Sequence, residues 1–153
     1  MNKPKIKGTR WETLVARYLS EVMGTRVERR ALHGGQDMGD LGPFRARGLE
    51  VIAECKNYAS FGQADVERWR RETDRERAAA NADVALLVVN QGRIGEKTVG
   101  LARVDVRLDQ LALMAALAPG HEPPDALDVS VWVSISLADA VSIMGGSPGR
   151  WGA

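Results

Sequence analysis

A stretch of eight residues, LEVIAECK at positions 49–56, decides the fold. Its apolar middle predicts a β-strand over Leu49–Lys56 that ends in charged side chains. Val84–Asn90 is a second, continuous apolar run of strand length, which is typical of a buried central strand. Between the two runs, Asp65–Ala82 predicts a helix that carries many opposite charges. Strand, helix and strand in this order indicate an α/β protein.

Helical periodicity also occurs near both ends of the chain. The apolar residues of Thr9–Met23 recur at spacings of three and four, which predicts an amphipathic helix, and Gly24 is placed to end it. A further helix is predicted over Leu108–Leu117. Ser136 is a candidate N-cap for a final helix that ends at Met144.

Five weaker segments supply the remaining strands and loops. They are an edge strand at Arg26–Leu32, a loop at His33–Gly39 with three glycines, a short strand at Asp40–Gly42 that breaks at Pro43, a strand at Val104–Arg107, and an alternating strand at Val129–Ile135. We therefore predict an α/β single domain over residues 1–144, built as a mixed sheet flanked by helices. Residues 145–153 form a glycine-rich tail.

Length and composition exclude several classes of protein. The chain has 153 residues, 44% apolar and 27% charged, which fits one globular domain. Its longest apolar run, Leu111–Ala118, is too short to cross a membrane, and an apolar signal segment does not follow the basic N-terminus. One cysteine, Cys55, excludes an intrachain disulfide framework. We expect a cytoplasmic protein without membrane contact.

The net charge of +1 hides an uneven distribution. Residues 1–30 carry eight basic against three acidic groups, residues 31–77 eight against nine, and residues 78–153 five against eight. A basic front end can face phosphates, although a solvated terminus explains the charge alone equally well.

The end of the strand at Leu49–Lys56 carries the groups that point to chemistry. Glu54 and Lys56 are two residues apart and share a face, while Cys55 turns to the opposite face. Asp40 lies fourteen residues upstream, where a hairpin can return it beside Glu54. Two converging carboxylates suit Mg²⁺. The alternatives are an exposed ion pair for Glu54 and Lys56, and a turn residue for Asp40. Asp37 is a less favoured rival ligand because it lies in the middle of the loop.

Asp40 followed by Glu54-x-Lys56 resembles the active-site signature of the PD-(D/E)xK nuclease superfamily. The piece at residues 7–12, with Gly8 and Glu12 four apart, is similar to the opening helix of archaeal-type Holliday-junction resolvases in that superfamily. The resemblance covers about residues 5–90. Gly39 stands where the motif has a proline.

The resemblance implies a restriction-endonuclease-like core, Mg²⁺ or Mn²⁺, and hydrolysis of DNA phosphodiester bonds. Asp40, Glu54, Glu12 and the backbone carbonyl of Cys55 would hold the metal, and Lys56 would activate the attacking water. Paired nicks in a four-way junction imply a homodimer. A nuclease that cuts duplex or single-stranded DNA, or a binding module without turnover, are the alternatives.

Two further groups of residues have competing interpretations. Glu12 is also placed to complete a capping box with Thr9, which would make it a helix cap. The candidates for DNA contact are Lys3, Lys5, Lys7, Arg10, His33 and Gln63, although an exposed histidine and a polar residue at a helix start are common without such a role.

Overall fold

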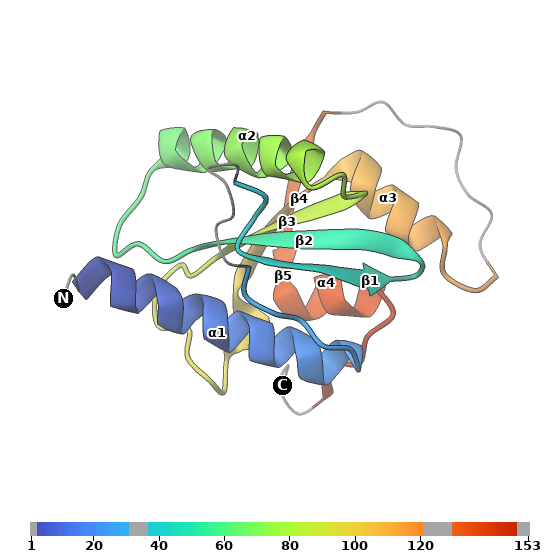
Figure 1. Ribbon diagram of the computed structural model, residues 1–153, viewed down its shortest axis with the longest axis horizontal. Coiled ribbons are helices and arrows are strands. Elements are labelled where there is room, and N and C mark those ends of the chain that lie inside the picture. The colour runs from blue at the N-terminus through green and yellow to red at the C-terminus, as the bar shows by residue number, and fades with distance from the viewer. Residues whose placement is uncertain (1–2, 31–36, 121–129, 150–153) are drawn as a thin grey trace.

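The structure is a computed structural model that describes residues 3–30, 37–120 and 130–149, with side chains from residue 7 onward. Four α-helices and one mixed sheet form a single α/β domain (Figure 1). In chain order the elements are α1 (Lys3–Met23), β1 (Leu41–Ala46), β2 (Leu49–Lys56), α2 (Gln63–Ala79), β3 (Val84–Val89), the short 3₁₀ helix η1 (Val99–Leu101), β4 (Arg103–Arg107), α3 (Leu108–Ala116), β5 (Trp132–Ser136) and α4 (Leu137–Ile143).

The five strands lie in the order β1-β2-β3-β4-β5. Only β2 and β3 are parallel, with Glu54 opposite Leu87, and the other three pairs are antiparallel. The crossover from β2 to β3 runs through α2, as a parallel pair requires. This confirms the predicted mixed sheet and places β3, which is buried along its whole length, at the centre.

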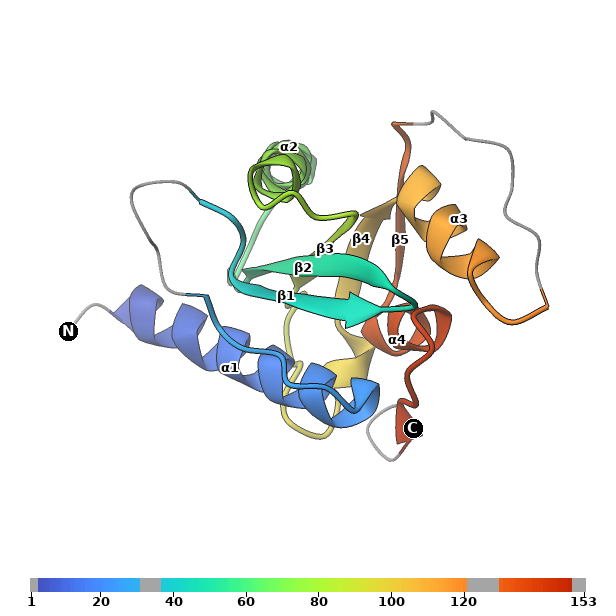
Figure 2. The ribbon, with the colours of Figure 1, turned by 45° about the vertical axis from the view of Figure 1, so that its right-hand side comes forward.

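Helices cover both faces of the sheet. Figure 2 shows α1 and α4 on one side and α2 on the other. Alternate residues of β2 divide between these layers: Val51 and Cys55 join the large core beneath α1, while Ile52 packs on the α2 side. The two helices that follow β4 contribute to the same core through Met114 of α3 and Leu137 at the start of α4. No helix in the described ranges is long and apolar enough to cross a membrane.

The first helix is longer than predicted. It begins at Lys3 rather than Thr9, so Thr9 lies inside the helix, where its carbonyl accepts a hydrogen bond from the Thr13 hydroxyl. The predicted capping box of Thr9 and Glu12 is therefore wrong. The apolar stripe indicated only the part of the helix that packs on the sheet, and the basic residues before it continue the same helix. Glu12 therefore does not cap the helix, and its side chain can pair with another residue.

The chain around the first strand also differs from the prediction. β1 continues through Pro43 instead of breaking there, with an irregular register between Leu41 and Phe44. As an edge strand it does not need the amide that proline lacks. The predicted strand at Arg26–Leu32 is reduced, in its described part, to one bridge between Arg29 and Leu41. The last strand is β5, and Val129 lies outside the described residues.

The second half of the chain follows the predictions more closely. β4, α3 and α4 lie within one residue of the predicted bounds. Ser136 caps α4 as expected, because its Oγ accepts a hydrogen bond from the Asp139 amide at 3.0 Å. Leu137, Ala140 and Val141 are buried in the chain's own core, so this helix completes the domain.

A buried carboxylate on β4 joins the sheet to α2. Asp105 is 0% exposed and accepts hydrogen bonds from Arg70 of α2, Arg103 of β4 and Ser134 of β5, each with a shortest distance of 2.7 or 2.8 Å. Burial alone would raise the pKa of Asp105, but these partners outweigh it and hold the pKa below its ordinary value. The carboxylate is therefore charged and fully paired at neutral pH.

We expect Asp105→Ala to lower the free energy of unfolding by about 3 kcal/mol or more, because two arginines lose a buried partner. Glu28→Ala, which removes an ion pair exposed on both sides, should cost less than about 1 kcal/mol. Urea unfolding followed by circular dichroism measures both. Equal, small losses in the two variants would contradict this role for Asp105.

Candidate active site

The last three residues of β2 divide between the two faces of the sheet. Glu54 and Lys56 project toward α2, and the Cys55 side chain is buried in the core beneath α1. Burial raises the pKa of the Cys55 thiol, so the residue is a poor nucleophile. The predicted alternation is confirmed, and it leaves only the backbone of Cys55 for chemistry.

Asp40 lies beside Glu54, as the hairpin predicted. Its Oδ2 accepts a hydrogen bond from the Cys55 amide at 2.8 Å, and its own amide donates to the Ala53 carbonyl at 3.1 Å. The preceding Gly39 has φ +92°, and a side chain there would crowd Ile52. Because proline is fixed near φ −65°, this backbone explains why a glycine precedes Asp40.

Lys56 forms a largely buried ion pair. Its Nζ lies 2.9 Å from Glu54 Oε1 and 3.4 Å from an oxygen of Glu72, and the side chains of Lys56 and Glu54 are 16% and 6% exposed. Burial favours a neutral amine, but the two carboxylates outweigh it and raise the pKa of Lys56. The pair is therefore not the exposed surface contact that was the alternative interpretation, and Lys56 is charged at neutral pH.

A cavity of about 530 Å³ brings the predicted site residues together. Glu12 reaches it from α1, Asp40 from the segment before β1, and Glu54 and Lys56 from β2. Glu12 also pairs with Arg29, whose nitrogens lie 2.8 and 2.9 Å from its Oε2. The full lining is Lys7, Gly8, Glu12, Asp40, Glu54, Cys55, Lys56, Asn57, Tyr58 and Ala59.

Two carboxylates of this cavity hold their protons unusually tightly. Burial, followed by the charges of Glu54 and Glu12, raises the pKa of Asp40 to about 7 against the opposing hydrogen bond from Cys55. Burial also raises the pKa of Glu54 to about 8, although Lys56 opposes the shift. Glu54 Oε2 is buried without a hydrogen-bond partner. Oxygen donors that lack a partner in this way suit a hard divalent cation.

An aromatic wall borders the cavity. Tyr58 is 54% exposed and stacks on the buried ring of Trp69, with ring centroids 5.2 Å apart. Phe61 packs on the same ring at 5.2 Å. Tyr58 therefore offers a supported apolar face to any ligand in the cavity.

Only some of the residues that were predicted to contact DNA lie at the cavity. Lys7 lines it, and Arg10 is exposed on α1. Gln63 is the exposed first residue of α2, where its amide reaches Glu67 at 3.5 Å. The side chains of Lys3 and Lys5, and the whole of His33, lie outside the described residues.

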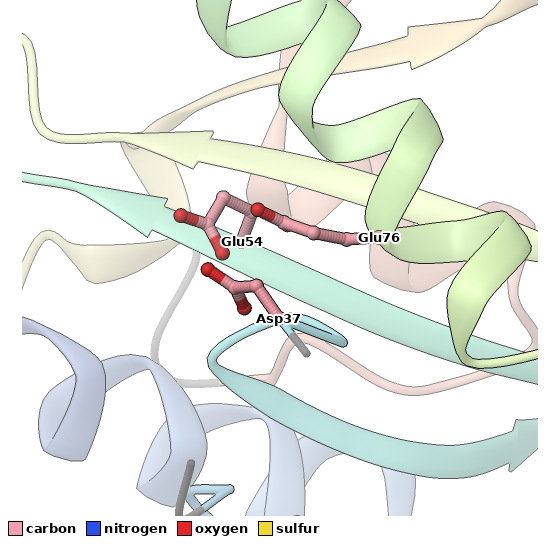
Figure 3. Close-up of side chains that lie close together, drawn as sticks. All are labelled: Asp37, Glu54 and Glu76. Carbon is pink, nitrogen blue, oxygen red and sulfur yellow. The ribbon is translucent and has the colours of Figure 1, made fainter. Parts of the chain in front are cut away.

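Two further acidic residues lie near Glu54. The sequence did not point to Glu76, and it favoured Asp37 less than Asp40. Figure 3 shows Asp37, Glu54 and Glu76 pointing toward one another, with one oxygen from each within 4.8 Å of the others. Glu76 stood among the charges of a helix expected to face solvent. A signal was present, however, because it continues the buried stripe of Val66, Trp69 and Thr73 at helical spacing.

Comparisons of the chain with protein-family models, with curated proteins and with solved structures gave no match. The residues that line the cavity therefore carry the functional interpretation.

The raised pKa values predict that the metal-free protein loses stability as pH rises. Unfolded carboxyls release their protons near pH 4, whereas the folded protein keeps those of Asp40 and Glu54 up to about pH 7 and 8. The folded state binds more protons over this window, so rising pH favours unfolding. The difference in the free energy of unfolding between Asp40→Asn and wild type should therefore shift in favour of Asp40→Asn as the pH rises from 5 to 8.

Urea unfolding at both pH values in EDTA measures this difference. Glu28→Gln, which neutralises an exposed carboxylate, is the control and should show no comparable gain. A difference between Asp40→Asn and wild type that is the same at pH 5 and pH 8 would contradict the raised pKa.

Proposed function

We propose that the chain is a metal-dependent endonuclease that hydrolyses DNA phosphodiester bonds, with four-way junctions as its substrate. One observation supports the proposal most strongly. Three carboxylates and a largely buried lysine, from α1, the segment before β1 and the end of β2, line a single cavity. Carboxylates that hold a metal beside a charged amine are the groups that phosphodiester hydrolysis needs.

The residues that would hold Mg²⁺ or Mn²⁺ are Asp40, Glu54, Glu12 and the carbonyl of Cys55. Their fit is supported by the oxygen-only donor set and by the unpartnered Oε2 of Glu54. When bound, the metal supplies Lewis acidity and a water of lowered pKa. Glu12 can contribute only if it shares its carboxylate with Arg29 or gives up that contact.

Lys56 has two roles in this proposal. Its ammonium is fixed by Glu54 and Glu72, so it can orient the attacking water without a search through rotamers. The same charge stabilises the negative charge that builds on the phosphate in the transition state. Because the Lys56 pKa is raised, the amine donates hydrogen bonds at neutral pH and does not act as the base.

The surroundings of the cavity fit a nucleic acid. Lys7 and Arg10 are exposed on α1 and can contact phosphates, an interaction that weakens with salt. Tyr58 can stack on a base or sugar that a junction leaves accessible. One domain holds one such cavity, so the paired nicks of a resolvase would need a homodimer with twofold symmetry. A restriction-endonuclease-like core and a cytoplasmic location belong to the same proposal.

The proposal predicts Mg²⁺- or Mn²⁺-dependent cleavage that Lys56→Ala reduces by about 100-fold or more, because a transition-state contact is lost. A labelled four-way junction and a linear duplex of one of its arms are the substrates. Lys97→Ala, which removes an exposed lysine far along the chain, is the control and should cleave like wild type.

The substrate pattern separates the alternatives. Paired nicks in the junction alone support a resolvase, and equal cutting of both substrates supports a nuclease without junction preference. Tight junction binding without cleavage, unaffected by divalent cations, would instead indicate a binding module and would refute the proposed activity.

A metal site at Asp40 also predicts a change in stability. Mg²⁺ or Mn²⁺ at about 100 times its Kd should add about 2.7 kcal/mol to the folded state and raise Tm by several degrees. Asp40→Asn should lose the part of this shift that comes from the Asp40 site, and Glu28→Gln should keep all of it. Differential scanning fluorimetry in EDTA and in each metal measures Tm. An equal shift in wild type and Asp40→Asn would place the ion elsewhere.

A further inference from the structure

Two buried carboxylates face one another between β2 and α2. Glu54 and Glu76 are 5% and 6% exposed, and each has an Oε2 that is buried without a hydrogen-bond partner. Asp37, which is exposed, approaches both from the segment before β1 (Figure 3). A buried carboxylate needs a compensating partner, because its desolvation is otherwise costly.

The protein cations nearby do not supply that partner. Lys56 contacts the other oxygen of Glu54 and an oxygen of Glu72, and no ion pair to Glu76 exists among the described residues. Burial raises the pKa of Glu76 to about 7, and the charges of Asp37 and Asp40 add to this effect, while the contact with Glu54 and the charge of Lys56 oppose it. The three carboxylates therefore lie in a strongly electronegative pocket.

Solvent reaches this pocket through a cavity other than the one that Glu12 lines. A second cavity, of about 520 Å³, opens between α2 and the end of β2. Its lining is Asp37, Lys56, Glu72, Arg75, Glu76 and Ala79. Lys56 borders both cavities, so the second cavity lies next to the first. A hydrated ion can enter here and keep some of its waters.

We propose that Asp37, Glu54 and Glu76 form a second divalent-cation site, on the α2 side of Lys56. Glu54 would belong to both sites, and only in this respect does the inference rest on the proposed function. Oxygens on opposite sides of Mg²⁺ lie about 4.2 Å apart, and around Ca²⁺ about 4.8 Å. The three carboxylate oxygens lie within 4.8 Å of one another, which matches a hard divalent cation of this size range.

A proton shared by Glu54 and Glu76 is the competing explanation, and Glu76→Gln distinguishes the two. The amide of glutamine can donate a hydrogen bond to Glu54, so it replaces a shared proton without loss. It cannot replace an anionic ligand. Cation binding therefore responds to this variant only if the pocket holds a cation.

The test counts Mn²⁺ ions bound per chain at pH 7.5, from the electron paramagnetic resonance signal of free Mn²⁺ during titration. Wild type should bind two ions, whereas Glu76→Gln and Asp40→Asn should each bind one. Glu67→Gln, the same change on an exposed part of α2, should keep two. Asp37→Asn removes an exposed ligand with little risk to folding, and should weaken one of the two ions by at least about tenfold.

The outcomes separate this inference from the nuclease proposal. Two ions in wild type and one in Glu76→Gln, without any DNA cleavage, would support the second site and refute the nuclease. Cleavage by a protein that binds a single Mn²⁺, retained in Glu76→Gln and Asp37→Asn, would overturn the second site and leave the nuclease standing. Binding of one ion in every variant would favour the shared proton and overturn the site as well.

Discussion

The candidate site depends on one hydrogen bond, from the Cys55 amide to Asp40. That amide is part of β2, which is fixed by parallel pairing with the buried β3, so its position follows from the sheet. The bond brings a residue from outside the sheet next to Glu54 and Lys56. Together with the bond from the Asp40 amide to the Ala53 carbonyl, it fixes the segment before β1 at the end of β2, where Asp37 and Asp40 line the two cavities.

Much of the fold could be predicted because local and tertiary preferences agree. The continuous apolar run of β3, the alternation around Glu54 and the cap at Ser136 each satisfy backbone geometry and burial together. The start of α1 and the path through Pro43 could not be predicted. In both places the sequence signal is weak, and contacts with the sheet decide the outcome.

The candidate site was predictable in its composition but not in its surroundings. Glu54 and Lys56 share one face of β2 by strand geometry, and the hairpin of β1 and β2 returns Asp40 beside them. Glu76 is distant in sequence, and only the packing of α2 on the sheet reveals that its stripe ends over Glu54. Neighbouring arginines made the helix resemble a solvated one, since charge density along a sequence does not show which side is buried.

The balance of charge around Glu54 links structure to function. Six carboxylates border the two cavities: Glu12, Asp37, Asp40, Glu54, Glu72 and Glu76. The cations that contact them or line the cavities are Arg29, Lys56, Arg68, Lys7 and Arg75. Arg29 pairs with Glu12, Lys56 with Glu54, and both Lys56 and Arg68 with Glu72, which leaves Asp37, Asp40 and Glu76 without an ion pair among the described residues. The network at Asp105, where arginines fully pair the acid, shows that this chain can neutralise a buried carboxylate when stability alone is at stake. Around Glu54 the described residues do not pair every carboxylate in this way, which supports the proposed cation sites.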